Sequence, residues 1–268
     1  MKVAAIQMVS TPDVARNLVA ARQLLQQAAD AGAELAVLPE YFCLLGRKDT
    51  DKLAIAEQPT GGPLQDFLSQ CAADFKLWVV GGTIPITTKE IGKVSNSTLV
   101  FNPQGQCVAR YDKIHLFCFD NGTERYDESR VLVSGNTPVT FDLPSVDGHM
   151  WRVGLSICYD LRFPELYRAL AADLLLVPSA FTHTTGLAHW ELLLRTRAIE
   201  NLAYVLAAAQ GGLHENSRRT WGQSMVVDAW GQILAQQAQG PGVVLADIDK
   251  PALEAARLQL PALKHRVL

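Results

Sequence analysis

Short apolar runs alternate with amphipathic stretches along residues 1–80. Residues 2–8, 35–38 and 77–80 are apolar runs of the length expected for buried strands. Residues 14–31 and 64–75 instead repeat their apolar positions with the helical period. A chain that alternates strands with helices in this way is predicted to form an α/β fold.

The rest of the chain combines hairpins with further alternation of strands and helices. Asn102-Pro103-Gln104-Gly105 has turn chemistry and joins strand-like runs at 97–101 and 106–111, which predicts a hairpin. Further expected elements are a strand at 151–157, a helix at 163–172, a strand at 174–177, a helix at 189–201, a strand at 203–209, a second hairpin at 224–235 and a helix from 250 to about 260. No linker-like segment interrupts this order, so we expect residues 1–268 to form a single domain.

Residues 117–138 differ from this pattern because they contain few apolar positions and no clear period. A long stretch without regular structure inside a compact domain is often a functional loop. We therefore expect an irregular loop that contributes to function.

The composition is that of an ordinary globular protein, with 49% hydrophobic and 19% charged residues among 268. The formal net charge is −3 and the basic residues are scattered, so we expect no nucleic acid partner. The N-terminal segment turns polar too soon for a signal peptide, and no apolar run approaches the ~20 residues that cross a bilayer. We expect a cytoplasmic protein that does not bind membranes.

The cysteines form an odd set without close pairing, which argues against a disulfide framework and against a structural zinc site. They are Cys43, Cys71, Cys107, Cys118 and Cys158. We expect free thiols in a reducing compartment, most of them inert.

Cys158 differs from the other cysteines in its position. It follows the strand predicted at 151–157 and precedes a helix that begins near Pro164. A thiol at such a turn is placed for attack, and free backbone N–H groups nearby stabilise a thiolate or an oxyanion. The alternative is a buried core cysteine. A serine nucleophile is disfavoured, because the sequence around Ser156 lacks the last glycine of the Gly-x-Ser-x-Gly elbow.

A cysteine nucleophile needs a base, and none of the six histidines has a local setting that singles it out. Glu40 follows the apolar run 35–38 and Pro39, so its carboxylate projects from the end of a buried strand. Lys113 leaves the second strand of the predicted hairpin in a similar way. Groups at the carboxyl ends of strands gather where α/β folds bind ligands. For both residues the alternative is a solvated surface position.

These positions lie in segments that resemble the three catalytic motifs of the nitrilase, or carbon–nitrogen hydrolase, superfamily. The segments are Leu38-Pro39-Glu40, Tyr111-Asp112-Lys113-Ile114-His115-Leu116 and Cys158-Tyr159-Asp160-Leu161-Arg162-Phe163-Pro164-Glu165, in the family's order. The similarity continues through residues 178–181, 186–191, 195–200 and 222–228, and so covers nearly the whole chain.

The resemblance implies a four-layer αββα sandwich that pairs into homodimers through its helical face and uses no metal or organic cofactor. It implies that Glu40 is the general base and that Cys158 attacks the carbonyl of a small-molecule amide. Lys113 and the Tyr159 N–H would bind the oxyanion. Glu128 matches a fourth polar residue of the family, which orients the lysine and the substrate.

Within the superfamily, the closest resemblance is to the branch of deaminated glutathione amidase and ω-amidase. In this branch Phe181 and Thr185 line the acyl pocket. Arg162 is placed to bind a substrate carboxylate through paired hydrogen bonds, and its alternative role is an ion pair with Asp160 or Glu165. The implied substrate is deaminated glutathione, which would yield 2-oxoglutarate and cysteinylglycine. Alternatives are 2-oxoglutaramate, an N-carbamoyl amino acid, or a catalytically silent binding or redox-sensing protein on this scaffold.

Overall fold

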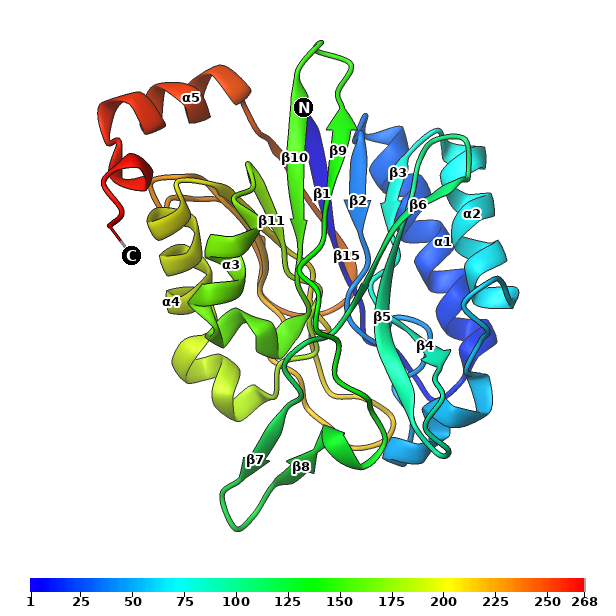
Figure 1. Cartoon of the computed structure of the whole chain (residues 1–268). Coiled ribbons are helices and arrows are strands. Elements are labelled where there is room, and N and C mark those ends of the chain that lie inside the picture. Colours follow the sequence, from blue (N-terminus) through cyan, green and yellow to red (C-terminus); the bar gives the residue numbers. More distant parts are fainter. Residues whose placement is uncertain (268) are drawn as a thin grey trace.

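A computed structural model describes residues 1–267, whose helices and strands form four layers (Figure 1). The first sheet has seven strands in the order β15-β1-β2-β3-β5-β4, and β6 pairs with β5. Its strands are β1 (Lys2–Gln7), β2 (Leu35–Val37), β3 (Trp78–Val80), β4 (Ile84–Thr87), β5 (Val94–Phe101), β6 (Cys107–Asp112) and β15 (Gly242–Asp247). Strands β1, β2 and β3 run parallel, as strands joined through helices do.

The second sheet has six strands in the order β14-β13-β12-β11-β10-β9. Its strands are β9 (Thr140–Pro144), β10 (Met150–Leu155), β11 (Leu174–Leu176), β12 (Tyr204–Ala207), β13 (Ser224–Val227) and β14 (Ile233–Gln237). The three central strands β10, β11 and β12 run parallel, whereas the outer pairings are antiparallel. Both sheets therefore have a parallel centre with antiparallel flanks.

Helices cover the outer face of each sheet (Figure 1). The helices are α1 (Val14–Asp30) and α2 (Pro63–Phe75) on the first sheet, α3 (Pro164–Leu170) and α4 (His183–Asn201) on the second, and α5 (Lys250–Gln259) near the C-terminus. Local signals fix where they begin: the Asp13 carboxylate accepts from the Arg16 N–H at 3.1 Å, and proline occupies the first turn of α2 and α3. Short 3₁₀ segments lie at Asp49–Ile55 (η1), Glu128–Arg130 (η2), Cys158–Arg162 (η3) and Ala262–Lys264 (η4).

Strand β1 shows how the sequence builds two hydrophobic cores. Successive side chains of a strand point to opposite faces. Val3 and Ala5 pack into the core between the two sheets, while Ala4 and Ile6 pack into the core beneath α1 and α2. A strand buried on both faces reads as a continuous apolar run, which is the pattern seen at its position in the sequence. The expected four-layer αββα sandwich is confirmed.

The two sheets join at one end, where the parallel strands finish. Met8, just after β1, pairs with Gln210, just after β12, and the Gly211 N–H donates to the Met8 carbonyl at 2.9 Å. Glu40 follows β2 at this end, and Cys158 follows β10. The parallel centres thus bring loops from both sheets together at one edge of the sandwich.

The prediction of an irregular loop at 117–138 is wrong in one respect. Strands β7 (Cys118–Asp120) and β8 (Arg125–Asp127) form a small antiparallel hairpin there, followed directly by η2 (Figure 1). Strands of three mostly polar residues are too short to show a period in the sequence. The segment still borders the site described below, because residues on both sides of the turn line its cavity.

Helix and strand bounds also differ from the prediction in several places. The helix expected at 189–201 begins at His183, where the Thr182 hydroxyl accepts from the Thr185 N–H at 3.4 Å. The helix expected at 163–172 is shorter and covers Pro164–Leu170. Strands β4, β9 and β15 were not predicted, since short or partly exposed strands at sheet edges carry a weak apolar signal.

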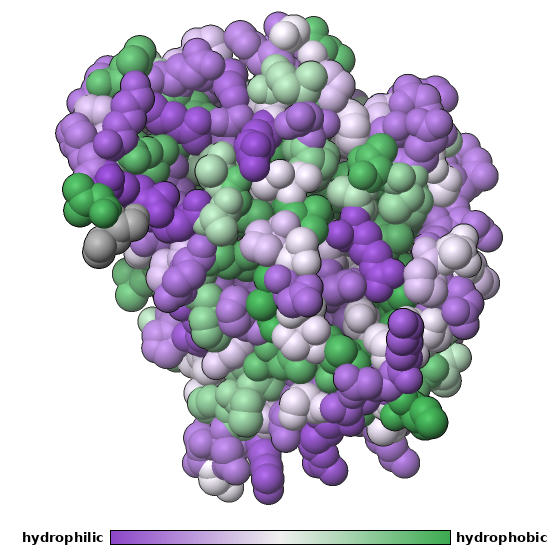
Figure 2. Space-filling model, in the orientation of Figure 1, coloured by the Kyte–Doolittle hydropathy of each residue, from purple (hydrophilic) through white to green (hydrophobic). Residues whose placement is uncertain are grey.

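Over residues 1–267, no helix is both long and apolar enough to cross a membrane. On the face shown in Figure 2, hydrophilic and hydrophobic residues are intermixed, and hydrophilic residues occupy much of the outline.

Candidate active site

Glu40 lies three residues after the end of β2, with its side chain 1% exposed. Its Oε1 accepts from the Lys113 Nζ and from the Asn96 Nδ2, both at 2.9 Å. Its Oε2 accepts from the Ala180 N–H, also at 2.9 Å. Both sheets therefore fix the carboxylate, since Asn96 lies on β5 and Ala180 follows β11.

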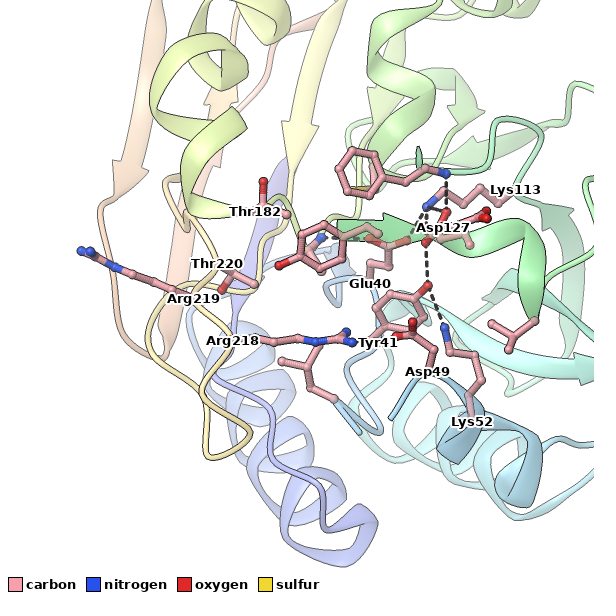
Figure 3. Close-up of a pocket in the computed structure, with 17 residues that line it drawn as sticks. Glu40, Tyr41, Asp49, Lys52, Lys113, Asp127, Thr182, Arg218, Arg219 and Thr220 are labelled. Carbon is pink, nitrogen blue, oxygen red and sulfur yellow. Dashed lines mark hydrogen bonds and ion pairs between the residues drawn. The ribbon is translucent and has the colours of Figure 1, made fainter. Parts of the chain in front are cut away.

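Lys113 follows β6 and reaches the same place from the hairpin (Figure 3). Its Nζ lies 2.9 Å from the Glu40 Oε1 and 2.8 Å from the Glu128 Oε2, and its side chain is 1% exposed. Burial opposes the charge, but the carboxylates of Glu128 and Glu40 outweigh it and hold the pKa of Lys113 well above its usual value. The site therefore contains a permanent buried ammonium.

Glu128 is the first residue of η2 and directly follows β8. Its Oε1 accepts from the Tyr41 hydroxyl at 2.9 Å, and its Oε2 accepts from the Phe117 N–H at 2.7 Å. Burial favours the neutral acid, but Lys113 and then Lys52 lower the pKa of Glu128 below its usual value. The carboxylate thus stays charged and forms a second ion pair with Lys113, in addition to that of Glu40.

Cys158 is the first residue of η3, and its φ of +49° lies in the left-handed region that few non-glycine residues adopt. Its N–H donates to the Pro178 carbonyl at 2.9 Å, which fixes the turn. The side chain lines one cavity together with Glu40 and Lys113. Burial and the Glu40 carboxylate raise the pKa of the Cys158 thiol well above its usual value, against the effect of Lys113. The resting group is therefore a thiol, which needs a base to become a nucleophile.

The cavity has a volume of about 680 Å³, including its open mouth, and charged and aromatic side chains line it (Figure 3). Its lining residues are Glu40, Tyr41, Leu45, Asp49, Lys52, Lys113, Phe117, Tyr126, Asp127, Glu128, Val131, Cys158, Ala180, Thr182, Arg218, Arg219 and Thr220. We call this space the main cavity. The 117–138 segment, which we expected to contribute to function, supplies five of these residues.

A smaller pocket of about 210 Å³ shares four lining residues with the main cavity, including Cys158. We call it the side pocket, and it contains all four residues expected to bind substrate: Tyr159, Arg162, Phe181 and Thr185. The two spaces meet at the thiol.

Arg162 packs on aromatic rings in the side pocket. Its guanidinium carbon lies 5.4 Å from the Phe181 ring centroid and 5.7 Å from that of Tyr159, and its Nη1 lies 3.3 Å from the His189 Nδ1. Within residues 1–267 it has no carboxylate partner within 4.0 Å, so the alternative ion pair with Asp160 or Glu165 is absent. Its charge remains available for a ligand.

Sequence reasoning missed several residues that hold the site together. Asn96 is one, and a signal for it exists: it lies in a polar run, Ser95-Asn96-Ser97-Thr98, inside a strand that is buried throughout. Such a run inside a buried strand indicates hydrogen bonding to other buried groups. Tyr41 is another, although it directly follows Glu40. Its hydroxyl connects Glu128 to Lys52, whose Nζ is 3.4 Å away.

The other cysteines lie outside this cluster. Cys43 and Cys71 are buried, Cys107 and Cys118 are exposed, and all are free thiols in the part of the chain that is described. Burial raises the pKa of Cys43 to about 12. Residues 1–267 contain no group of three or more His, Cys, Asp or Glu side chains arranged to hold a metal ion.

The chain is similar to known proteins over nearly its whole length. The deaminated glutathione amidase of Synechocystis sp. is 42% identical over 98% of this chain and 97% of its own length. The structure of Nit3 from Saccharomyces cerevisiae, a member of branch 10 of the nitrilase superfamily, superposes with a TM-score of 0.87 at 32% identity and covers all of this chain and 97% of that one.

A more distant structure, a variant of the amidase from Nesterenkonia sp. AN1, contains acrylamide added at the active site cysteine. It is 26% identical, has a TM-score of 0.77, and covers 97% of this chain and 98% of its own. The carbon–nitrogen hydrolase family model matches residues 2–258. The chain therefore belongs to the carbon–nitrogen hydrolase family and is a hydrolase of carbon–nitrogen bonds.

Proposed function

We propose that this chain hydrolyses the amide of a small carboxylate-bearing metabolite through a thioester on Cys158. The observation that carries the proposal is the convergence of three groups on one cavity. Glu40 and Lys113, 73 positions apart in sequence, are joined at 2.9 Å, and the Cys158 thiol lines the same space. A protonated thiol beside a carboxylate and a fixed ammonium is the set that acyl transfer needs.

In the first half-reaction the Glu40 carboxylate accepts the thiol proton while the Cys158 sulfur attacks the amide carbonyl carbon. The oxyanion that forms is stabilised by the Lys113 ammonium and the Tyr159 N–H. The intermediate collapses, the C–N bond breaks, and Glu40 returns the proton to the departing amine. The acyl group remains on sulfur as a thioester.

The second half-reaction uses the same groups with water. Glu40 accepts a proton from the water, whose oxygen attacks the thioester carbonyl, and the C–S bond then breaks. The acid leaves and the sulfur regains the proton from Glu40. Glu128 keeps Lys113 in place throughout, because its carboxylate lies 2.8 Å from the ammonium and does not take part in the proton transfers.

We infer that the substrate is deaminated glutathione, which would be cleaved to 2-oxoglutarate and cysteinylglycine. Two observations support this: relatives that match nearly the whole chain at about 40% identity are named for that substrate, and the side pocket offers Arg162 without a carboxylate partner in the described residues. In this scheme the 2-oxoglutaryl group occupies the side pocket. Arg162 binds its carboxylate, Thr185 supplies a hydroxyl and Phe181 forms an apolar wall.

The test is a comparison of kcat/KM for the purified protein on deaminated glutathione, 2-oxoglutaramate, an N-carbamoyl amino acid and a simple aliphatic amide. Release of cysteinylglycine and of ammonia would be measured, with Cys158→Ala as the blank. We expect the highest value for deaminated glutathione. A higher value for 2-oxoglutaramate would assign the chain as an ω-amidase instead, and no turnover of any amide would favour a silent binding protein.

We also propose that the chain works as a homodimer in the cytoplasm, paired through α4. Leu192 and Ile199 are exposed on this helix, at 65% and 46%, and their spacing of seven residues places them on one face, where exposed apolar side chains favour self-association. The four free thiols outside the site suit a reducing compartment. Sedimentation of the wild type and of Leu192→Glu tests the dimer: we expect dimer and monomer respectively, and a monomeric wild type would refute it.

A further inference from the structure

The proposed substrate carries one carboxylate on each side of the bond that is cleaved. One belongs to the 2-oxoglutaryl group, and the other is the C-terminus of the cysteinylglycine that leaves. The site also has two parts, because the side pocket and the main cavity meet at Cys158. If the acyl group occupies the side pocket, the leaving group lies in the main cavity, and its carboxylate needs a cationic partner there.

Lys52 offers that cation. It belongs to η1 and lines the main cavity, where its Nζ points toward the Tyr41 hydroxyl at 3.4 Å (Figure 3). The ammonium also lies 4.6 Å from the centroid of the Tyr41 ring. Within residues 1–267 no carboxylate oxygen lies within 4.0 Å of it. The more distant carboxylates of Glu128 and Asp49 favour its charged form.

The other cations of the main cavity are placed differently. Lys113 is held between two carboxylates, and the Arg218 Nη2 lies 2.7 Å from the Asp49 Oδ1. Arg219 is exposed, and its guanidinium points away from the other labelled residues (Figure 3). Lys52 is thus a half-buried ammonium directed into the cavity without a direct counter-charge. A charged group removed from water in this way gains from an anionic ligand.

We propose that Lys52 binds the terminal carboxylate of the leaving dipeptide and so selects for deaminated glutathione over amides that release ammonia. This inference rests on the proposed function and deepens it. A dipeptide extends about 7 Å from the scissile nitrogen, so its carboxylate lies well away from the reacting atoms, on the leaving-group side of the site. Lys52 contributes binding energy distant from the reacting atoms, and Arg218, paired with Asp49, forms the wall beside it.

A comparison of two substrates isolates this role. Deaminated glutathione and 2-oxoglutaramate share the same acyl group, but only the first has a carboxylate on its leaving group. We expect Lys52→Met to raise the KM for deaminated glutathione about tenfold or more relative to the KM for 2-oxoglutaramate, because a charge-assisted hydrogen bond is lost. Any effect that Lys52 has through Tyr41 and Glu128 falls on both substrates alike and cancels in this ratio. Lys52→Arg should retain most of the binding, and Lys89→Met, at an exposed position outside the cavity, should match the wild type.

A third substrate, deaminated glutathione with its glycine carboxylate converted to an amide, completes the cycle. The wild type should show the same rise in KM with this substrate that Lys52→Met shows with the natural one. The variant and the amide together should raise KM no further, since both remove the same contact. Thermal unfolding of each variant verifies that the fold is retained.

Other results would overturn the inference. Equal losses on both substrates would mean that Lys52 acts through Tyr41 and Glu128 on the chemistry. An unchanged KM for deaminated glutathione in Lys52→Met would mean that its carboxylate binds elsewhere. If the wild type hydrolyses only 2-oxoglutaramate or neither substrate, the proposed function is wrong and this inference fails with it.

Discussion

The Tyr111 hydroxyl donates a 2.7 Å hydrogen bond to the Asp160 Oδ2, and both groups are buried. Tyr111 lies two residues before Lys113, and Asp160 lies two residues after Cys158. The same carboxylate also accepts from the Ile157 N–H at 2.8 Å on Oδ2 and from the His115 N–H at 3.0 Å on Oδ1. Asp160 therefore fastens the strand end that carries the ammonium to the turn that carries the thiol.

Tyr111→Phe removes one donor from this buried carboxylate while it keeps the ring that packs in the core. We expect a loss of about 1–3 kcal/mol in the free energy of unfolding, the usual cost of an unmade buried hydrogen bond. We also expect a several-fold lower kcat, because Lys113 and Cys158 lose part of their alignment. Urea unfolding and steady-state kinetics measure the two effects.

Tyr204→Phe is the control, since its hydroxyl contacts Asp249 far from the site. Unchanged turnover in Tyr111→Phe would show that the clamp does not align the site.

Lys113→Met leaves two carboxylates buried without their shared cation. We expect turnover to be lost and the free energy of unfolding at neutral pH to fall by about 3–5 kcal/mol, the cost of breaking a buried ion pair from one side. Without Lys113, burial dominates and the pKa of Glu128 should rise above its value in the unfolded chain.

The sign of the pH dependence follows from linkage. In the wild type the lowered pKa of Glu128 gives stability that is present above the carboxyl's unfolded pKa, near 4.3, and is lost as the pH falls through its folded pKa. In Lys113→Met the sign reverses, so the variant should be more stable at pH ~5 than at pH ~8. Urea midpoints at the two pH values measure this. The same dependence of stability on pH in both proteins would contradict the claim that Lys113 keeps the buried Glu128 charged.

Glu40→Gln separates the charge of Glu40 from its shape. We expect turnover to fall about 10²–10⁴-fold, because the amide cannot accept the thiol proton. The pKa of the Cys158 thiol should move down toward its usual value, since the Glu40 carboxylate is one cause that raises it. Thiolate absorbance during a pH titration, taken as the difference from Glu40→Gln/Cys158→Ala, measures this shift. A thiol pKa that stays fixed or rises would place Glu40 outside electrostatic reach of the sulfur.

Much of the fold could be predicted from the sequence because its central strands are apolar and its helices are amphipathic. The continuous apolar run of β1 and the proline and aspartate signals at helix starts are local features. Three of the strands that were missed, β4, β9 and β15, obtain their structure from pairing with a neighbour, which no local period records.

The site residues, too, fall into those that local sequence indicates and those that only the fold brings into place. Glu40, Lys113 and Cys158 were found because each follows a strand and lies in a motif-like segment. Asn96 and Lys52 were missed because their roles depend on which distant residues they meet. Lys52 reads as one of many polar residues in a short segment, and only the fold places it across Tyr41 from Glu128.

The central claim is that Cys158 carries the acyl group. The most direct test is intact-mass and peptide-mass measurement of the wild type quenched with acid during turnover of deaminated glutathione, beside Cys158→Ala and Cys118→Ala. We predict a 2-oxoglutaryl adduct on the peptide that contains Cys158, present in the wild type and in Cys118→Ala and absent from a folded, inactive Cys158→Ala. An adduct on another residue, or substantial turnover by Cys158→Ala, would contradict the account.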